Sequence, residues 1–353
     1  PEDRTIGHQS GGNQSRRCGS AACRNSGMDR ARPNSQYVVM KPIQLLQLVV
    51  VCFVLTACAH GKCPGRHHRG CSAEAGVKPP LVLMTDFGLK DGAVSAMKGV
   101  AYATAPDVRI FDLTHEVPPY DIWEGAFRLA QTYKYWPPGT VFVTVVDPGV
   151  GSERKSIVAR SRSGHFFVGP DNGLYTLVAD ANGLDSVRVL DENKQRLKGS
   201  EDSYTFHGRD LYVYVGARLA SGQLAFADAG SELKDFARIA YQKATAMDGS
   251  IKGTIPLLDP QYGNVWTNIP GDMVRTVFKD TKKLHVTLRN GARVAYAGEL
   301  TIEDTFAGVA KGKPLLYFNS LLNLSLALNQ GDFAGRHKIS SGPDWTIEVK
   351  AAK

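Results

Sequence analysis

The chain has 353 residues, of which 43% are hydrophobic and 22% are charged, a composition that excludes a wholly disordered protein and allows two ordinary domains. Its formal net charge is +8, but 11 of its 42 basic residues and only four of its 34 acidic residues lie in the first 80 positions. The remainder is therefore nearly neutral, which excludes the basic stripe that a nucleic-acid-binding surface needs.

The first 80 residues form a leader with its own organisation. Residues 1–39 are polar and aperiodic, which predicts a disordered segment or upstream sequence that the natural protein lacks. Residues 40–58 combine a lysine, a short apolar run and Leu-Thr-Ala-Cys, the pattern of a bacterial lipoprotein signal peptide with Cys58 as the lipidated residue. The alternatives are an uncleaved anchor or a chance apolar stretch. Residues 59–80 predict a linker.

The leader also bears on location and on cysteine chemistry. A lipidated Cys58 predicts a cell-envelope protein anchored to a bacterial membrane, and without such processing the protein would be cytoplasmic. All six cysteines precede residue 72, so neither a disulfide nor a thiolate metal site can belong to the rest of the chain.

Residues 81–243 predict an α/β domain, because short apolar runs alternate with stretches of helical periodicity. We expect strands at 81–84, 108–113, 141–146, 156–159 and 165–168, and helices at 92–105, 122–135 and 210–220, the last closed by Gly222. This alternation predicts a largely parallel central sheet.

Residues 251–353 predict a smaller, β-barrel-like domain. Short apolar runs separated by turn residues lie at 254–258, 274–278, 284–288, 293–297, 315–318 and 345–349. The sequence contains no internal repeat.

Reactive groups of open α/β sheets collect at the carboxyl ends of strands, where Thr85-Asp86-Phe87-Gly88 follows the first predicted strand. The carboxylate of Asp86, with Asp91 nearby, suits two vicinal ribose hydroxyls. The competing interpretation is a helix N-cap.

The stretch Val145-Val-Asp-Pro-Gly-Val-Gly-Ser-Glu-Arg154 carries more information. A strand delivers Asp147 into a Pro/Gly turn that can return Arg154 toward it. The pair could serve catalysis or could be a structural ion pair.

Two further motifs belong to this domain. Thr205-Phe206-His207-Gly-Arg-Asp sets an imidazole at a helix start, where His207 could act as a base or orient a nucleophile. Pro170-Asp-Asn-Gly-Leu174 indicates a turn that leads into a helix.

In the second domain, the segment 259–268 combines a carboxylate, amides and two aromatic rings. Such a mixture suits a ligand with an ammonium group and a purine, since Asp259 can hold the cation and Asn264 can pair with a purine edge. An ordinary hairpin with an aromatic core is the alternative.

Taken in series, these motifs resemble the S-adenosylmethionine hydrolase family, the hydroxide adenosyltransferases related to fluorinases and chlorinases. The motifs TDFG, VVDPGVGSER, PDNGL, TFHGRD and YGNVWTNI carry the resemblance, which runs from about residue 81 to the C-terminus. It implies hydrolysis of S-adenosylmethionine to adenosine and methionine, without a cofactor or a metal. It also implies a homotrimer whose sites lie between one subunit's first domain and a neighbour's second.

The resemblance assigns roles residue by residue. It implies that Asp147, Arg154 and His207 activate the water. The implied substrate-binding residues are Asp86, Asp91, Thr205 and Phe206 at the sugar, Asp259 at the methionine ammonium, Ser320 at its carboxylate, and Tyr262, Asn264, Trp266 and Phe306 around the adenine and sugar.

Departures from the halogenating relatives are informative. Those enzymes have a tyrosine where this chain has Asp147 and a hydroxyl residue at Val150, and fluorinases have a serine at Gly208, so the resemblance favours water over halide. Leu321 and Leu328 stand where fluorinases have arginines, so Ser320 would hold the methionine carboxylate without the two arginines of the fluorinases.

Two other functions are compatible with parts of the sequence. Asp86, Asp91, Asp112, His115, Asp147, His207 and Asp210 could form the cage of a metal-dependent phosphoesterase, although arginines adjoin these residues. Alternatively, an envelope protein could bind adenosine or S-adenosylmethionine without turnover, because the substrate is made in the cytoplasm.

Overall fold

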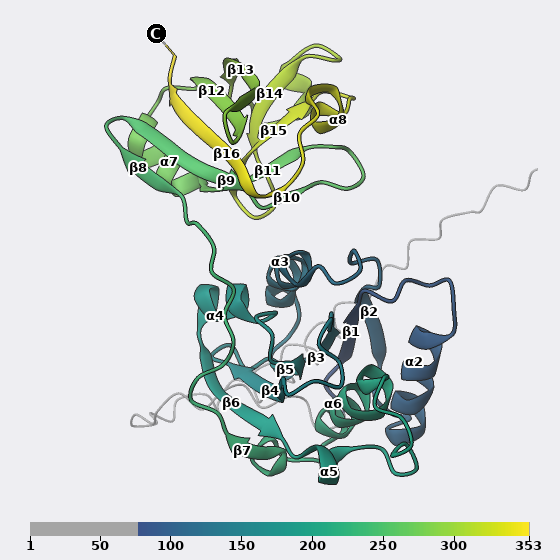
Figure 1. Cartoon of the computed structure of the whole chain (residues 1–353). Helices are drawn as coiled ribbons and strands as arrows, with labels where there is room; N and C mark the ends of the chain where they lie inside the picture. The colour runs from purple at the N-terminus through teal and green to yellow at the C-terminus, as the bar shows by residue number, and fades with distance from the viewer. Residues whose placement is uncertain (1–76, 353) are drawn as a thin grey trace, which may run out of the picture. The chain divides into compact units, whose positions relative to one another are not determined.

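The computed structural model describes residues 77–352, drawn in colour in Figure 1. The expectations for segments 1–39 and 40–58, for Cys58 and for most of the linker 59–80 lie outside these residues. No helix within 77–352 combines the length and the apolar character that a membrane span requires.

The N-terminal domain is built on a mixed sheet in the order β2-β1-β3-β5-β4-β6-β7. Its strands are β1 (Leu81–Thr85), β2 (Ile110–Thr114), β3 (Val141–Val145), β4 (Ser156–Ser161), β5 (Phe166–Pro170), β6 (Leu184–Leu190) and β7 (Gly230–Glu232). The strands β2, β1, β3 and β5 are mutually parallel, whereas β4, β6 and β7 add antiparallel pairs. The turn 162–165 is too short for a parallel crossover, so β4 and β5 must pair antiparallel.

Helices cover both faces of this sheet (Figure 1). They are α2 (Ala93–Thr104), α3 (Ile122–Thr132) with the 3-10 turn η1 (Tyr133–Tyr135), α4 (Thr176–Asn182), α5 (Glu192–Gln195), the π-helical turn η2 (Gly208–Tyr212), α6 (Val213–Ser221) and the 3-10 turn η3 (Phe226–Asp228). The predicted helices 92–105, 122–135 and 210–220 correspond to α2, α3 with η1, and η2 with α6. Gly222 ends α6 at a φ of 80°, a left-handed conformation that glycine adopts without strain.

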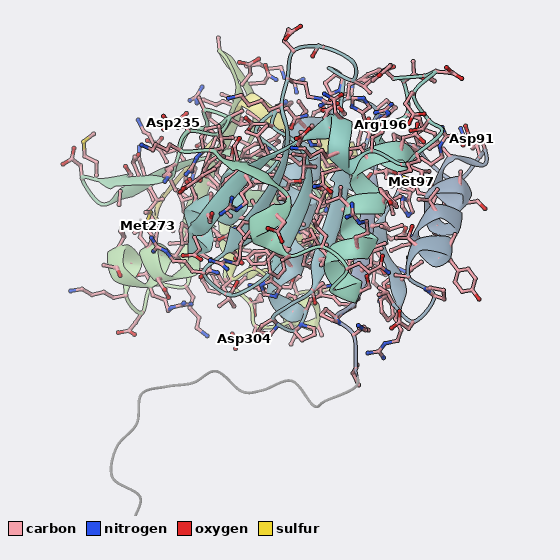
Figure 2. All side chains as sticks on the ribbon, turned by 90° about the horizontal axis from the view of Figure 1, so that it is seen from below. Asp91, Met97, Arg196, Asp235, Met273 and Asp304 are labelled. Carbon is pink, nitrogen blue, oxygen red and sulfur yellow. The ribbon has the colours of Figure 1, made fainter. Side chains whose placement is uncertain are left out.

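Successive side chains of a strand point to opposite faces of the sheet, so the buried strands contribute to two hydrophobic cores, one on each face. On β1, Leu81 and Leu83 pack with α2 and α6, whereas Val82 and Met84 pack with α3 and α4. Figure 2 labels Met97 on the buried face of α2 and Asp91 at its exposed start. The carboxyl ends of β1 and β3 are thereby held rigidly side by side.

The C-terminal domain consists of two antiparallel sheets around one core. One contains β10 (Leu257–Leu258), β11 (Val265–Pro270), β15 (Asn323–Leu328) and β14 (Pro314–Phe318); the other contains β13 (Arg293–Thr301), β12 (Lys283–Asn290), β16 (Gly342–Ala351), β9 (Ser250–Ile255) and β8 (Thr245–Met247). Its helical elements are α7 (Gly271–Phe278), the 3-10 turn η4 (Phe306–Gly308) and α8 (Phe333–His337).

The prediction of a strand at 274–278 was wrong, because these residues belong to α7. The buried side chains Val274 and Phe278 are four residues apart, which places both on one face of a helix. A short apolar run cannot by itself distinguish that spacing from a strand.

Candidate active site

The site is built where β1 and β3 end next to each other. The two strands pair in parallel, with Thr85 opposite Val145, so Asp86 and Asp147 leave the sheet at the same edge. The backbone N–H of Asp86 donates to the carbonyl of Val145 over 3.3 Å, which ties the two strand ends together. The sequence-based expectation that polar residues gather at this edge holds for both carboxylates.

A tight turn then brings Arg154 back to Asp147. Val150 N–H donates to the Asp147 carbonyl, and Gly151 adopts a φ of 77° that suits glycine. Arg154 Nε lies 2.9 Å from Asp147 Oδ1, and its Nη2 lies 2.6 Å from Oδ2, a bidentate ion pair with side chains only 10% and 4% exposed. Burial opposes the charge, but the hydrogen bonds that Arg154 donates to Asp147 and the nearby charges of Asp147 and Glu192 together outweigh it and raise the pKa of Arg154.

His207 completes the group from the start of η2. Its Nδ1 lies 2.8 Å from Arg154 Nη2. Because a guanidinium only donates, Nδ1 must accept, and the hydrogen of the neutral ring then resides on Nε2. Burial, with smaller contributions from Arg154 and Arg196, lowers the pKa of His207, which favours this neutral form.

Asp147 and His207 border a cavity of about 380 Å³, whereas Arg154 lies next to them outside its lining. Its lining residues are Asp86, Phe87, Pro119, Tyr120, Val145, Asp147, Val150, Thr205, Phe206, His207 and Gly208. Asp86 Oδ2 accepts from Tyr120 N–H at 2.9 Å, and burial raises the pKa of Asp86. The predicted residues Asp86, Asp147, Thr205, Phe206 and His207 therefore share one cavity.

Asp91 lines an adjoining, more open pocket together with Phe87, Thr205 and Phe206. Its Oδ1 accepts the backbone N–H of Ala93 at 2.9 Å, so Asp91 satisfies the start of α2. The N-cap position of α2 is Gly92, so the capping role considered for Asp86 does not fall on Asp86.

Residues of the C-terminal domain line a different cavity, of about 1130 Å³. Asp259, Tyr262, Asn264, Phe306 and Leu328 all border it. Asn264 Nδ2 donates to Asp259 Oδ2 at 3.1 Å, which orients the amide.

Two expected binding residues do not border that cavity. Trp266 is buried, lies 6.5 Å from the Phe127 ring and donates from Nε1 to the Tyr317 hydroxyl. Ser320 is exposed on the turn between β14 and β15. Leu321 packs with the cluster that contains Trp266.

Sequence reasoning missed several residues that the structure places at the site. Tyr120 lines the cavity at a φ of 69°, and its only sequence signal was the Pro-Pro pair before it, which marks a loop after β2. Ser156, Glu192 and Tyr212 lie behind Arg154 and carried no recognisable motif. Asn172 of the PDNGL motif donates to the Val146 carbonyl at 2.8 Å and so braces the backbone before Asp147.

Three of the five carboxylates considered for a phosphoesterase cage are already paired with cationic side chains or a histidine. Asp112 contacts Lys98 and His115, Asp147 contacts Arg154, and Asp210 contacts Arg209. Within residues 77–352 no group of three or more candidate ligands is arranged to hold a metal ion. The cations next to these carboxylates disfavour that hypothesis.

Comparison with known proteins decides the family. Residues 81–230 match the SAM hydroxide adenosyltransferase N-terminal domain, and residues 253–346 match the corresponding C-terminal domain. The chain belongs to the SAM hydroxide adenosyltransferase family. The resemblance inferred from the motifs is thus confirmed.

Members of this family with assigned names are similar over most of their lengths. A protein of Methanocaldococcus jannaschii named (R)-S-adenosyl-L-methionine hydrolase is 38% identical over 60% of this chain and 74% of its own. The protein of the same name from Salinispora tropica is 35% identical over 75% and 95%. A fluorinase of Actinoplanes is 27% identical over 76% and 97%.

Among solved structures, an uncharacterized conserved protein from Thermotoga maritima superposes with a TM-score of 0.70. It is 31% identical, covering 76% of this chain and 99% of its own.

Proposed function

We propose that this protein hydrolyses S-adenosyl-L-methionine to adenosine and methionine, by attack of water at the ribose C5′. The observation that carries the proposal is the Asp147, Arg154 and His207 constellation beside the cavity that Asp86 also borders. The hydrolase names of the similar proteins support it.

The reaction needs no general acid. A sulfonium departs as a neutral thioether, so the site must only align a water opposite the C5′–S bond and remove its proton. Asp147 accepts two hydrogen bonds from Arg154, and the remaining lone pairs of its carboxylate are free to accept from the water. Arg154 supplies positive charge that favours developing hydroxide character.

His207 orients the guanidinium in this mechanism. Its Nδ1 already accepts from Arg154, and its other ring nitrogen carries the hydrogen, so no ring nitrogen is free to take a proton from water. Of the two roles considered from the sequence, base or orienting group, the geometry supports the second.

Substrate recognition follows from the same cavities. Asp86 would hold the ribose hydroxyls, with Thr205 and Phe206 along the sugar. Asp259 would bind the methionine ammonium, and Asn264 would form hydrogen bonds with the adenine. The rings of Tyr262 and Phe306 would stack on the adenine and sugar. Trp266 would act through packing, and Ser320 would reach the methionine carboxylate from its exposed turn.

Water is favoured over halide as the nucleophile for two reasons. Asp147 places a negative charge at the cavity, which repels a halide ion, and Val150 has no hydroxyl that could donate a hydrogen bond to a halide. Incubation of the full-length protein with S-adenosyl-L-methionine in ¹⁸O-labelled water tests the reaction. We expect adenosine labelled at its 5′ oxygen together with unlabelled methionine. Tight binding without adenosine release would instead favour the non-catalytic binding protein.

Three further features complete the proposal. The protein forms a homotrimer, supported by the separate cavities that hold the catalytic and the adenine residues of one chain.

The two sheets of the C-terminal domain close in a barrel-like manner, supported by the bridge between Ile302 and Leu316. The mature protein is lipidated at Cys58 and anchored in the cell envelope, supported by the sequence of 40–58; retention of Cys58→Ser in the membrane fraction would refute the anchor.

A further inference from the structure

Ser156 connects the catalytic arginine to a carboxylate outside the motifs. Its Oγ lies 2.9 Å from Arg154 Nη1, 2.6 Å from Glu192 Oε1 and 3.0 Å from the Tyr212 hydroxyl. A serine hydroxyl has one hydrogen, and the carboxylate can only accept it. Ser156 therefore donates to Glu192 and accepts from both Arg154 and Tyr212.

Tyr212 can fill that donor role because burial raises its pKa well above the ordinary value. The direction of every hydrogen around Ser156 is then fixed by Glu192. Arg154 Nη1 also lies 3.9 Å from Glu192 Oε1, so the guanidinium has a carboxylate at each end, Asp147 at one and Glu192 at the other.

The second oxygen of Glu192 faces His207. The distance from His207 Nε2 to Glu192 Oε2 is 4.0 Å. Nε2 carries the ring hydrogen, is buried, and finds no hydrogen-bond partner among residues 77–352. The Glu192 side chain is 33% exposed, which gives its carboxylate room for the small rotation that would bring Oε2 within reach of this N–H.

We propose that Glu192 is a positioning residue of the reaction. One carboxylate oxygen holds the hydroxyl of Ser156, and the other receives the Nε2–H of His207. Together they fix the imidazole tautomer whose Nδ1 accepts from Arg154, and so align Arg154 with Asp147. This role in catalysis rests on the proposed hydrolysis, whereas the Nε2–H tautomer of His207 can be tested without any reaction.

Only a carboxylate satisfies both hydrogens. A glutamine at position 192 has one acceptor oxygen, so it can serve Ser156 or His207 but turns an N–H toward the other. Removing the side chain leaves both without a partner. The loss of activity should therefore follow the number of hydrogen bonds that residue 192 can still accept, rather than the size of its side chain.

The experiment compares Glu192→Ala and Glu192→Gln with the control Glu153→Ala. Glu153 is exposed near Arg154 and makes no hydrogen bond or ion pair with any described residue, so it reports the loss of a nearby charge alone. We expect Glu192→Ala to lower kcat by roughly tenfold to a hundredfold with little change in KM, because misalignment affects the reacting geometry. Glu192→Gln should fall between wild type and alanine, and the control should match wild type.

A second readout is independent of turnover. In protein labelled with ¹⁵N-histidine, with the His207→Gln variant used to assign the signal, the wild type should show His207 as the Nε2–H tautomer. Both Glu192 variants should show exchange between tautomers, and this exchange should be smaller in Glu192→Gln because its one oxygen can still accept from Nε2. If the wild type proved inactive, this measurement would still decide the role of Glu192.

Wild-type kcat in Glu192→Ala, together with an unchanged His207 signal, would overturn the proposal. If Glu192→Ala fails to fold, as judged by circular dichroism, Glu192→Gln carries both readouts, since it preserves volume and one hydrogen bond.

Discussion

Asp147 and Arg154 lie seven residues apart on opposite sides of a glycine-containing turn, and two hydrogen bonds join their side chains at 2.9 and 2.6 Å. This pairing needs the planar fork of arginine, because a lysine ammonium presents no matched pair of donors. The same guanidinium reaches Ser156 and His207 with its remaining hydrogens. Arg154 is thus the centre of the site rather than one of three equal members.

Arg154→Lys should keep the charge and lose the geometry. We expect hydrolysis to slow by roughly a hundredfold to a thousandfold, comparable to the loss of one preorganised donor. Steady-state assays of adenosine release measure the change, and circular dichroism controls for folding. A lysine variant with near wild-type turnover would show that charge alone suffices.

Acidification should inactivate the enzyme through His207. Burial lowers its pKa from the ordinary value of 6.5, so the acid limb of kcat/KM should lie below pH 6.5. Protonation would place a hydrogen on Nδ1 against the donating Arg154 and break their contact. A pH profile of wild-type turnover tests this; an acid limb above pH 6.5 would contradict it.

The same shift makes stability depend on pH. The unfolded chain binds the histidine proton near pH 6.5, whereas the folded chain binds it only at lower pH. The free energy of unfolding should therefore fall as the pH drops from 6.5 through the folded pKa and level off below it. Urea unfolding across this range should show the fall in wild type and a smaller one in His207→Gln.

Thr85 should stabilise the loop that carries Asp86. Its buried hydroxyl lies 2.8 Å from His115 Nδ1 and accepts the Phe87 backbone N–H at 3.2 Å. Thr85→Val keeps the shape but leaves both groups unpaired, which should cost about 1–3 kcal/mol of unfolding free energy. KM should also rise because Asp86 is less well placed, and an unchanged midpoint in chemical denaturation would argue against this role.

Gly169 should tolerate no side chain. A Cβ there would stand 2.3 Å from the Thr144 carbonyl oxygen and 2.5 Å from the Tyr175 hydroxyl, both in the packed interior beside β3. Gly169→Ala should therefore destabilise the protein by about 1–3 kcal/mol or more through overpacking. Gly99→Ala on α2 is the matched control, since nothing lies within 4 Å of its added carbon. Thermal unfolding of the two variants should separate them clearly.

The proposed trimer predicts complementation between inactive variants. His207→Ala removes a catalytic residue and Asn264→Ala an adenine residue, and each alone should be nearly inactive. If sites combine domains of neighbouring subunits, random mixing should restore about a quarter of wild-type activity, because half of each contributing domain is intact. Light scattering should report a trimer; a monomer, or no recovery after subunit exchange, would refute the shared site.

Much of the N-terminal fold could be predicted because its buried strands and amphipathic helices have different hydrophobic periods. The strands at 81–84 and 141–146 and the helix at 92–105 agree with β1, β3 and α2 to within a residue or two. The C-terminal domain was less predictable. Its short runs, such as 274–278, leave the period undefined until the core they face is known.

The sequence by itself determined the two-domain plan and the identities of Asp86, Asp147, Arg154 and His207, since strand-end motifs and glycine-containing turns encode local geometry. Only the tertiary structure decided which nitrogen of His207 accepts a hydrogen bond and that Ser156 and Glu192 stand behind Arg154. Glu192 lies 38 residues from Arg154 in sequence, and no local pattern reports contacts between separate elements. Such contacts arise from packing of the whole domain, which fixes distances that the order of residues leaves open.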